Sequence, residues 1–222
     1  MHQKNIAQIL NDTIERYPLL SSSKEDIKYA FDLLCDCFSN KNKLLLCGNG
    51  GSASDSDHIV GELMKSFFYK RTLSEEMKNK LIAASPEKGE YLAEKLQPAL
   101  RSISLTGHNA LNTAFANDVD PHLIFAQQVL GYGDNGDILF GISTSGNSEN
   151  VINAMIAAKA IGVKTIGLTG KKGGQLKEIC DVAICVDRME TADIQELHLP
   201  VYHALCKMLE LNFFGNFSPA KN

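Results

Sequence analysis

The feature that most constrains the fold of this chain is a regular alternation of short apolar runs with segments of helical periodicity. Five such runs read as strands, at residues 43–48, 102–107, 137–143, 165–170 and 182–186. The first four end in glycine or serine, where a doubly wound fold places its ligands. Buried strands linked by helices form parallel sheets that are covered on both faces. We therefore predict an α/β fold with a three-layer, doubly wound, parallel five-stranded sheet.

The segments between these runs space their apolar residues at three and four positions, which is typical of helices. We expect helices at residues 52–70, 109–116, 121–131, 149–162 and about 191–213, with a short one between the last two strands. Two further helices, at residues 3–18 and 24–39, form an N-terminal helical segment within residues 1–40. No linker or internal repeat divides the chain, so residues 1–222 are expected to form a single domain.

Residues 71–98 differ in character from the rest of the chain. They are rich in charged residues, favour helix and contain no apolar run. We interpret them as a helical insertion between the first two strands, most simply a solvated lid or a packing element.

Composition excludes several classes of protein. The net charge is -4 and no basic stripe stands out, so nucleic acid is not expected as a direct partner. No apolar run approaches the roughly 18 residues of a membrane span, and the N-terminus lacks the apolar segment of a signal peptide. We therefore expect a cytoplasmic protein without membrane contact. The six cysteines include no Cys-x-x-Cys pair and are expected to be reduced core thiols.

The loop after the first strand, residues 47–58, contains the G-x-G-x-x-A pattern of a dinucleotide site at Gly48, Gly50 and Ala53. Such a site also needs an acidic residue at the end of the second strand. That strand runs into Thr-Gly-His-Asn, residues 106–109, and offers no acid. The dinucleotide interpretation is therefore disfavoured.

A second loop, residues 143–148, follows the third strand and reads Ser-Thr-Ser-Gly-Asn-Ser. Its four hydroxyl groups belong to Ser143, Thr144, Ser145 and Ser148. Together with the N–H groups of the helix that follows, these hydroxyls suit a phosphate monoester held by neutral groups. A serine-rich cap and turn is the alternative, although four hydroxyls exceed what one cap needs.

Two helices carry residues with the spacing of metal ligands. His58 and Glu62 are four residues apart and share one helix face. The last helix carries Gln195, His198 and His203, which could point near the same side. Together the two helices could offer nitrogen and oxygen donors to one divalent ion such as zinc. A surface ion pair and satisfied core histidines remain the alternatives.

Four motifs, in the same order, resemble those of the phosphoheptose isomerases, a family of sugar isomerase (SIS) domain enzymes. They lie at residues 47–58, 114–120, 143–150 and 191–203. The resemblance covers nearly the whole chain apart from residues 71–98. It implies a flavodoxin-like sheet, a homotetramer with active sites between subunits, and conversion of sedoheptulose 7-phosphate to glycero-manno-heptose 7-phosphate.

The resemblance also implies roles for individual residues. The loop at residues 143–148 would bind the phosphate of a sugar phosphate substrate. The remaining substrate contacts would come from Asn49, Gly50, Gly51, Ser52, Asn117, Asp118 and Gln195. One zinc ion per subunit would be held by His58, Glu62, Gln195 and His203. Glu62 and His203 also match the family's proposed base and acid.

These roles fit the chemistry of aldose–ketose isomerisation. Moving one proton between C1 and C2 needs a base, an acid and stabilisation of an enediolate, and zinc would polarise the carbonyl. Asp57, directly before His58, departs from the family pattern and could alter the surroundings of the metal. A non-catalytic SIS-domain protein that binds a protein partner or senses a sugar phosphate is the alternative. The presence of both Glu62 and His203 favours an enzyme.

Overall fold

The computed structural model describes residues 5–215, and these form one five-stranded sheet. All of its strands are parallel and lie in the order β2-β1-β3-β4-β5. They are β1 (Leu44–Gly48), β2 (Ser102–Ser104), β3 (Ile138–Ile142), β4 (Lys164–Thr169) and β5 (Val182–Cys185). The five predicted strands and the α/β fold are confirmed, although the second strand is shorter than expected.

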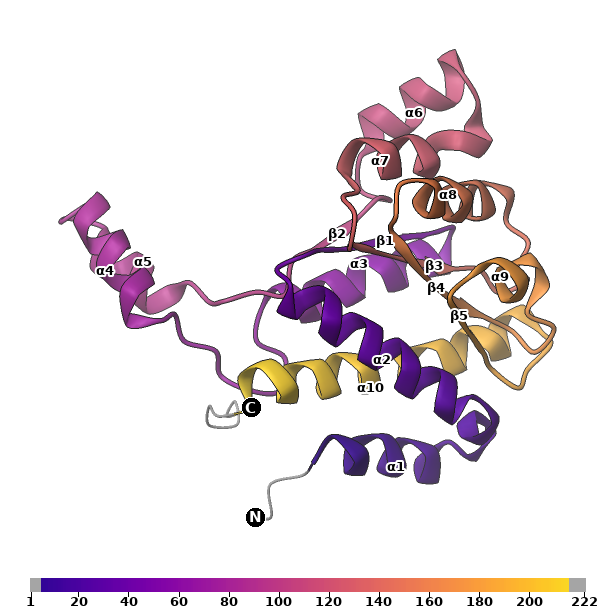
Figure 1. Ribbon diagram of the computed structural model, residues 1–222, viewed down its shortest axis with the longest axis horizontal. Helices are drawn as coiled ribbons and strands as arrows, with labels where there is room; N and C mark the ends of the chain where they lie inside the picture. Colours follow the sequence, from indigo (N-terminus) through magenta and orange to yellow (C-terminus); the bar gives the residue numbers. More distant parts are fainter. Residues whose placement is uncertain (1–4, 216–222) are drawn as a thin grey trace.

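Helices cover both faces of the sheet (Figure 1). One layer contains α1 (Ile6–Arg16), α2 (Lys24–Ser39), α3 (Gly51–Met64) and α10 (Thr191–Phe214), with the short 3-10 helix η1 (Pro18–Ser23) between the first two. The other contains α6 (Asn109–Asp118), η2 (Pro121–Leu123), α7 (Ile124–Tyr132), α8 (Glu149–Ala160) and α9 (Gly174–Ile179). The N-terminal helix begins at Ile6, and residues 3 and 4 of the predicted helix lie outside the described part of the chain.

Two hydrophobic clusters hold these layers together, one on each face of the sheet. Side chains alternate between the faces along each strand, because successive residues of a strand point in opposite directions. Leu44 and Leu46 of β1 pack with α2, α3 and α10, whereas Leu45 and Cys47 pack with α7 and α8. This alternation buries all five residues of β1, as expected for a central parallel strand.

The helix expected at residues 52–70 ends at Met64, and this part of the prediction was wrong. The carboxylate of Glu210 on α10 accepts hydrogen bonds from the N–H groups of Phe67, Phe68 and Tyr69, at 2.9, 2.5 and 3.1 Å. The same carboxylate pairs with Arg71, whose Nε lies 2.9 Å from Glu210 Oε1. Both charged side chains of this pair are fully buried. These contacts hold residues 67–71 out of the helix.

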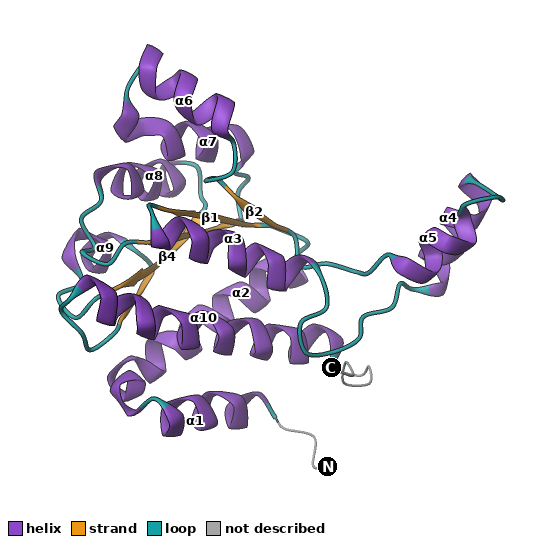
Figure 2. Ribbon diagram, turned by 180° about the vertical axis from the view of Figure 1, so that it is seen from behind, coloured by secondary structure: helices purple, strands orange, loops and turns teal. Residues whose placement is uncertain are grey.

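Between α3 and β2 the chain forms a hairpin of two helices, α4 (Glu75–Ala84) and α5 (Gly89–Lys95), which we call the arm. The arm stands away from the body of the molecule, and its helices pack on each other (Figures 1 and 2). Gly89 permits this close packing, because a Cβ atom there would lie 2.4 Å from Ile82 Cα. The helical character predicted for residues 71–98 is confirmed. Several apolar side chains of the arm are exposed, namely Met77, Ile82, Tyr91 and Leu96.

Two further expectations concern membranes and cysteines. None of the helices within residues 5–215 combines the length and apolarity that a membrane crossing requires. All six cysteines are free thiols, either buried or half-buried. Burial raises the pKa of Cys35, Cys37 and Cys180 to about 12, so these thiols stay protonated at neutral pH.

Candidate active site

Two loops meet at the C-terminal edge of the sheet. Gly48 of β1 pairs with Ile142 of β3, so the loops that follow these strands leave the sheet at the same level. The side chains of Asn49 and Asn150 exchange two hydrogen bonds of 2.9 Å and join the first loop to the start of α8. In a doubly wound sheet this edge is where ligands bind.

The first loop turns sharply into α3. Gly50 has a φ of +55°, a conformation that glycine adopts without strain. Gly51 leaves room for the side chain of Gln195 on α10, because a Cβ atom at Gly51 would lie 2.4 Å from Gln195 Nε2. Ser52 is buried and follows directly. The loop therefore presents backbone atoms beside the first turns of α10.

The second loop gathers hydroxyl groups before α8. Ser143 Oγ lies 2.8 Å from Ser148 Oγ and 3.5 Å from Ser145 Oγ. Gly146, with a φ of +68°, packs so closely on the turn after β4 that a Cβ atom would lie 1.9 Å from Gly173 O. The carbonyl of Thr144 accepts a hydrogen bond of 3.1 Å from the N–H of Gly170 in the same turn. The turn after β4 therefore fixes the shape of the hydroxyl loop.

A cluster of two histidines and a glutamate lies between α3 and α10. His58 Nε2 is 3.3 Å from Glu62 Oε1, and the rings of His58 and His203 meet edge to face with centroids 5.1 Å apart. Glu62 Oε2 and His203 Nε2 are buried without a hydrogen-bond partner among residues 5–215. Buried polar atoms are rarely left in this state, and a functional role is one explanation.

The donor atoms of this cluster fit a divalent ion such as zinc, which binds imidazole nitrogen and carboxylate oxygen. The two unpartnered atoms, Glu62 Oε2 and His203 Nε2, are of the same two types. Within residues 5–215, however, no three His, Cys, Asp or Glu side chains are already grouped so as to hold an ion. The side chains would have to close around it, and Gln195 would join them from its position against Gly51.

His203 lies in a partly apolar setting. The ring of Phe67 packs against it with centroids 5.5 Å apart. Burial lowers the pKa of His203, and repulsion by His58, when that ring is protonated, and by Lys207 acts in the same direction. The imidazole is therefore mostly neutral near pH 7, the form that can bind a metal or accept a proton.

Two residues that the sequence analysis missed complete the surroundings of His58. Tyr202 donates a hydrogen bond of 3.1 Å to Asp55 Oδ1, and its hydroxyl oxygen lies 3.1 Å from His58 Nδ1. Burial and the charge of Asp55 raise the pKa of Tyr202, so the hydroxyl keeps its proton. The sequence holds only a weak sign of this contact: Asp55 lies one helical turn before His58, and Tyr202 directly precedes His203.

Two residues discussed from the sequence lie elsewhere. Asp57 accepts a hydrogen bond of 2.8 Å from Thr106 Oγ1 and thus faces the turn after β2, away from the ring of His58 that Tyr202 contacts. His198 is fully buried, and neither of its ring nitrogens has a hydrogen-bond partner within residues 5–215. Burial lowers the pKa of His198 to about 4, so this residue is a neutral core histidine at pH 7.

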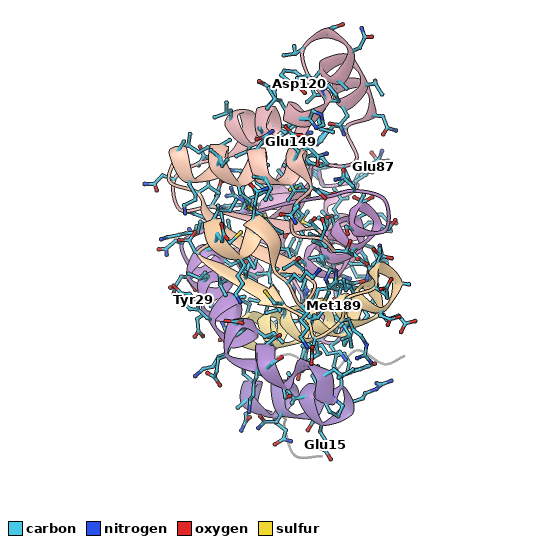
Figure 3. The ribbon with its side chains drawn as sticks, turned by 90° about the vertical axis from the view of Figure 1, so that its right-hand side faces the viewer. Glu15, Tyr29, Glu87, Asp120, Glu149 and Met189 are labelled. Atoms are coloured by element: carbon cyan, nitrogen blue, oxygen red, sulfur yellow. The ribbon has the colours of Figure 1, made fainter. Side chains whose placement is uncertain are left out.

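Asn117 and Asp118 are not brought to the histidine cluster of their own chain. Both are exposed at the end of α6, where the Asn117 side chain donates 2.9 Å to Asp118 Oδ1. Helix α6 packs on α7 and η2, whereas His203 lies on α10 in the opposite layer. Figure 3 shows Asp120, two residues after α6, well away from Met189, two residues before α10.

Comparison with known protein families gives a match to the SIS domain over residues 84–170. A curated phosphoheptose isomerase from a Nitratiruptor species is 40% identical over 83% of this chain and 86% of its own length. The phosphoheptose isomerase of Akkermansia muciniphila is 34% identical over 90% of this chain and 93% of its own length. The similarity therefore extends well beyond the matched domain segment.

Solved structures give the same picture. A phosphoheptose isomerase from Francisella tularensis superimposes with a TM-score of 0.72 at 30% identity, covering 92% of this chain and 95% of the other. That of Neisseria gonorrhoeae gives 0.69 at 32% identity, covering 92% and 94%. Fold and sequence thus point to the same group of enzymes.

Proposed function

Because the chain belongs to the phosphoheptose isomerase family and is a phosphosugar isomerase, we propose that it interconverts sedoheptulose 7-phosphate and glycero-manno-heptose 7-phosphate in heptose biosynthesis. The observation that carries the proposal is that His58, Glu62 and His203 lie together where α3, which begins in the first loop, packs against α10. The free thiols are compatible with action in the cytoplasm.

The hydroxyl loop at residues 143–148 would hold the phosphate of the substrate. The clustered hydroxyls of Ser143, Ser145 and Ser148 and the N–H groups at the start of α8 are donors suited to a phosphate. Binding at this remote group would place the other end of the sugar, where the proton moves, beside α3 and α10.

We propose one zinc ion per subunit, held by His58, Glu62, Gln195 and His203. When bound, zinc would polarise the substrate carbonyl and stabilise the negative charge that develops as the proton moves. The approach of Glu62 Oε1 to His58 Nε2, at 3.3 Å, and the unpartnered buried Nε2 of His203 support this assignment.

Glu62 and His203 would carry out the proton transfers. Glu62 would take the proton from the substrate carbon, and His203 would act as the acid by giving the N–H proton of its neutral imidazole to the neighbouring oxygen. The carboxylate is used asymmetrically: Oε1 faces His58, while Oε2 has only the distant Lys65 Nζ at 3.7 Å. Oε1 can therefore stay beside His58 as a metal ligand while Oε2 accepts the proton, so that Glu62 could act both as ligand and as base.

We propose that the enzyme is a homotetramer whose active sites lie between subunits. Asn117 and Asp118 belong to a motif of the family but lie on the sheet face opposite α10. A neighbouring subunit would bring its own α6 to the site. Homo-oligomers with such shared sites are built from symmetric contacts.

The sequence analysis left a non-catalytic SIS-domain protein as the alternative, and the phosphoheptose isomerase relatives argue against it. A sugar-phosphate sensor would need only the hydroxyl loop and no proton-transfer residues. The specific observation against it is that Glu62 and His203 are both present and lie on facing helices, next to the same residue, His58.

The test is an NMR panel of ketose phosphates in deuterated water, with and without added zinc. We expect deuterium to enter at C1 of sedoheptulose 7-phosphate and at C2 of the aldose that forms from it. Glu62→Gln should abolish this exchange and retain substrate binding. Lack of turnover of every sugar by the zinc-loaded protein would overturn the proposal, and undiminished exchange in the variant would remove Glu62 as the base.

A further inference from the structure

The contact between His58, Tyr202 and Asp55 plays no part in the reaction proposed above, yet it reaches the centre of the site. Tyr202 is 2% exposed and its ring meets that of His58 edge to face, with centroids 5.5 Å apart. The hydroxyl thus stands at a fixed point between His58 Nδ1 and Asp55 Oδ1, 3.1 Å from each.

Counting protons shows what this arrangement does to His58. A tyrosine hydroxyl has one proton, and a carboxylate is acceptor only. Tyr202 gives its proton to Asp55, so its oxygen can only accept at His58. His58 Nδ1 must then carry the proton of the neutral imidazole, and Nε2 is left with its lone pair.

The unprotonated Nε2 faces the carboxylate of Glu62, with Oε1 3.3 Å away. Two lone pairs at this distance repel each other unless a proton or a metal cation lies between them. Metal-binding histidines in proteins commonly donate the N–H of their other nitrogen to a carboxylate, directly or through another group, and this fixes their orientation.

We propose that Asp55 and Tyr202 are positioning residues that hold His58 as the Nδ1–H tautomer and present Nε2, together with Glu62, to a divalent cation. The proposal rests on the function proposed above for the metal, but the tautomer is a property of the chain alone. The departure at Asp57 is not involved, because that carboxylate accepts from Thr106.

The test measures the tautomer of His58 by nitrogen-15 NMR of the metal-free protein, and zinc affinity by competition with a chromophoric chelator. Wild type should show Nδ1–H. Tyr202→Phe removes only the hydroxyl and should give a mixture of tautomers, with zinc bound about 10- to 100-fold more weakly. Asp55→Ala releases the tyrosine proton towards Nδ1 and should shift His58 to Nε2–H.

The matched control is Tyr91→Phe, on the exposed face of the arm, which should change neither reading. A purely structural role for Tyr202 and Asp55 would leave the tautomer unaltered in folded variants, and that result would overturn the proposal. If wild type shows Nδ1–H and the variants shift it, but the protein neither binds zinc nor turns over a sugar, the positioning role stands and the proposed function fails.

Discussion

Single buried groups set much of the pH response of this molecule, and His198 is the clearest case. This residue of α10 is fully buried, and its ring nitrogens have no hydrogen-bond partner of ordinary geometry among the described residues. Such a group stays neutral in the folded chain but titrates normally once the chain unfolds. The folded state therefore loses stability relative to the unfolded state at any pH at which the unfolded chain, but not the folded chain, binds a proton at this residue.

We predict that this one residue makes the protein acid-sensitive. Burial lowers the pKa of His198 from 6.5 to about 4, so the unfolded chain binds this proton at higher pH than the folded chain. The contribution of His198 to the free energy of unfolding is fully present above pH 6.5 and is lost as the pH falls towards 4. The free energy of unfolding in urea should drop by about 3 kcal/mol over this window from this residue.

The effect is isolated by comparing wild type with His198→Leu, which replaces the titratable imidazole by an apolar side chain of similar length. The difference in unfolding free energy between wild type and variant should itself change by that amount across the window. A difference that stays constant with pH would show that His198 does not carry the effect.

The family resemblance, rather than the spacing, singled out His58, Glu62, Gln195 and His203. Helical spacing alone paired His58 with Glu62 and grouped Gln195 and His203 with His198. It could not find Asp55 and Tyr202, since their roles depend on which residues of α3 and α10 meet. That pairing is decided by packing between helices far apart in the sequence.

At the scale of elements, one buried ion pair, Arg71–Glu210, holds the end of α3 and the base of the arm, by which we mean residues 67–71, between α3 and α4. Arg71 donates to the carbonyls of Leu63 and Glu62 at the end of α3, at 2.7 and 3.1 Å, while its Nε pairs with Glu210. Its guanidinium also stacks over the ring of Phe214, 4.4 Å from the centroid. The pair therefore links α3, the arm and α10.

We predict that Glu210→Gln lowers the free energy of unfolding by about 3–5 kcal/mol, because it leaves the buried Arg71 charge unpaired. Hydrogen exchange at residues 67–69, whose N–H groups bind Glu210, should speed up as well. Chemical denaturation and exchange measurements check both effects.

The matched control for this prediction is Glu76→Gln, which breaks the exposed pair with Lys80 on the arm. Exposed pairs of this kind contribute little to stability, so no measurable change is expected. Equal losses in the two variants would contradict a special role for the buried pair.

Helices and strands were largely predictable because their apolar periodicity is local. The early end of α3 was not, since helical propensity continues through residues 65–70 and the competing acceptor, Glu210, lies on the last helix. The second strand was overestimated because it ends at Ser104, one residue before the last hydrogen bond to β1, in which Leu105 N–H donates 2.8 Å to Leu46 O.

At the scale of the whole molecule, one chain does not bring all predicted substrate contacts together. The hydroxyl loop follows β3 and the histidine cluster lies between α3 and α10, whereas α6 carries Asn117 and Asp118 in the other layer. Apolar periodicity in one sequence predicts helices and strands, but a subunit contact leaves no periodic signal there.

We predict that mixed oligomers recover activity that neither parent has. Glu62→Gln and Asp118→Asn should each be nearly inactive, and their co-expressed mixture should regain about a quarter of the wild-type rate, because some sites then combine two intact halves. Turnover of the purified mixed oligomer is the measurement. Co-expression of Glu62→Gln with His203→Ala is the control, and it should regain nothing because both changes lie on the same half. Recovery in neither mixture would place the site within one chain.

The position of α10 in the chain has a consequence for synthesis. Helix α10 supplies Gln195, Tyr202 and His203 to the site and Glu210 to the base of the arm, and it follows every other described element in sequence. A ribosome makes α3 early, so His58 and Glu62 are exposed on the nascent chain long before their partners exist. The proposed metal site and the anchoring of the arm are therefore completed by the same late event, the docking of α10.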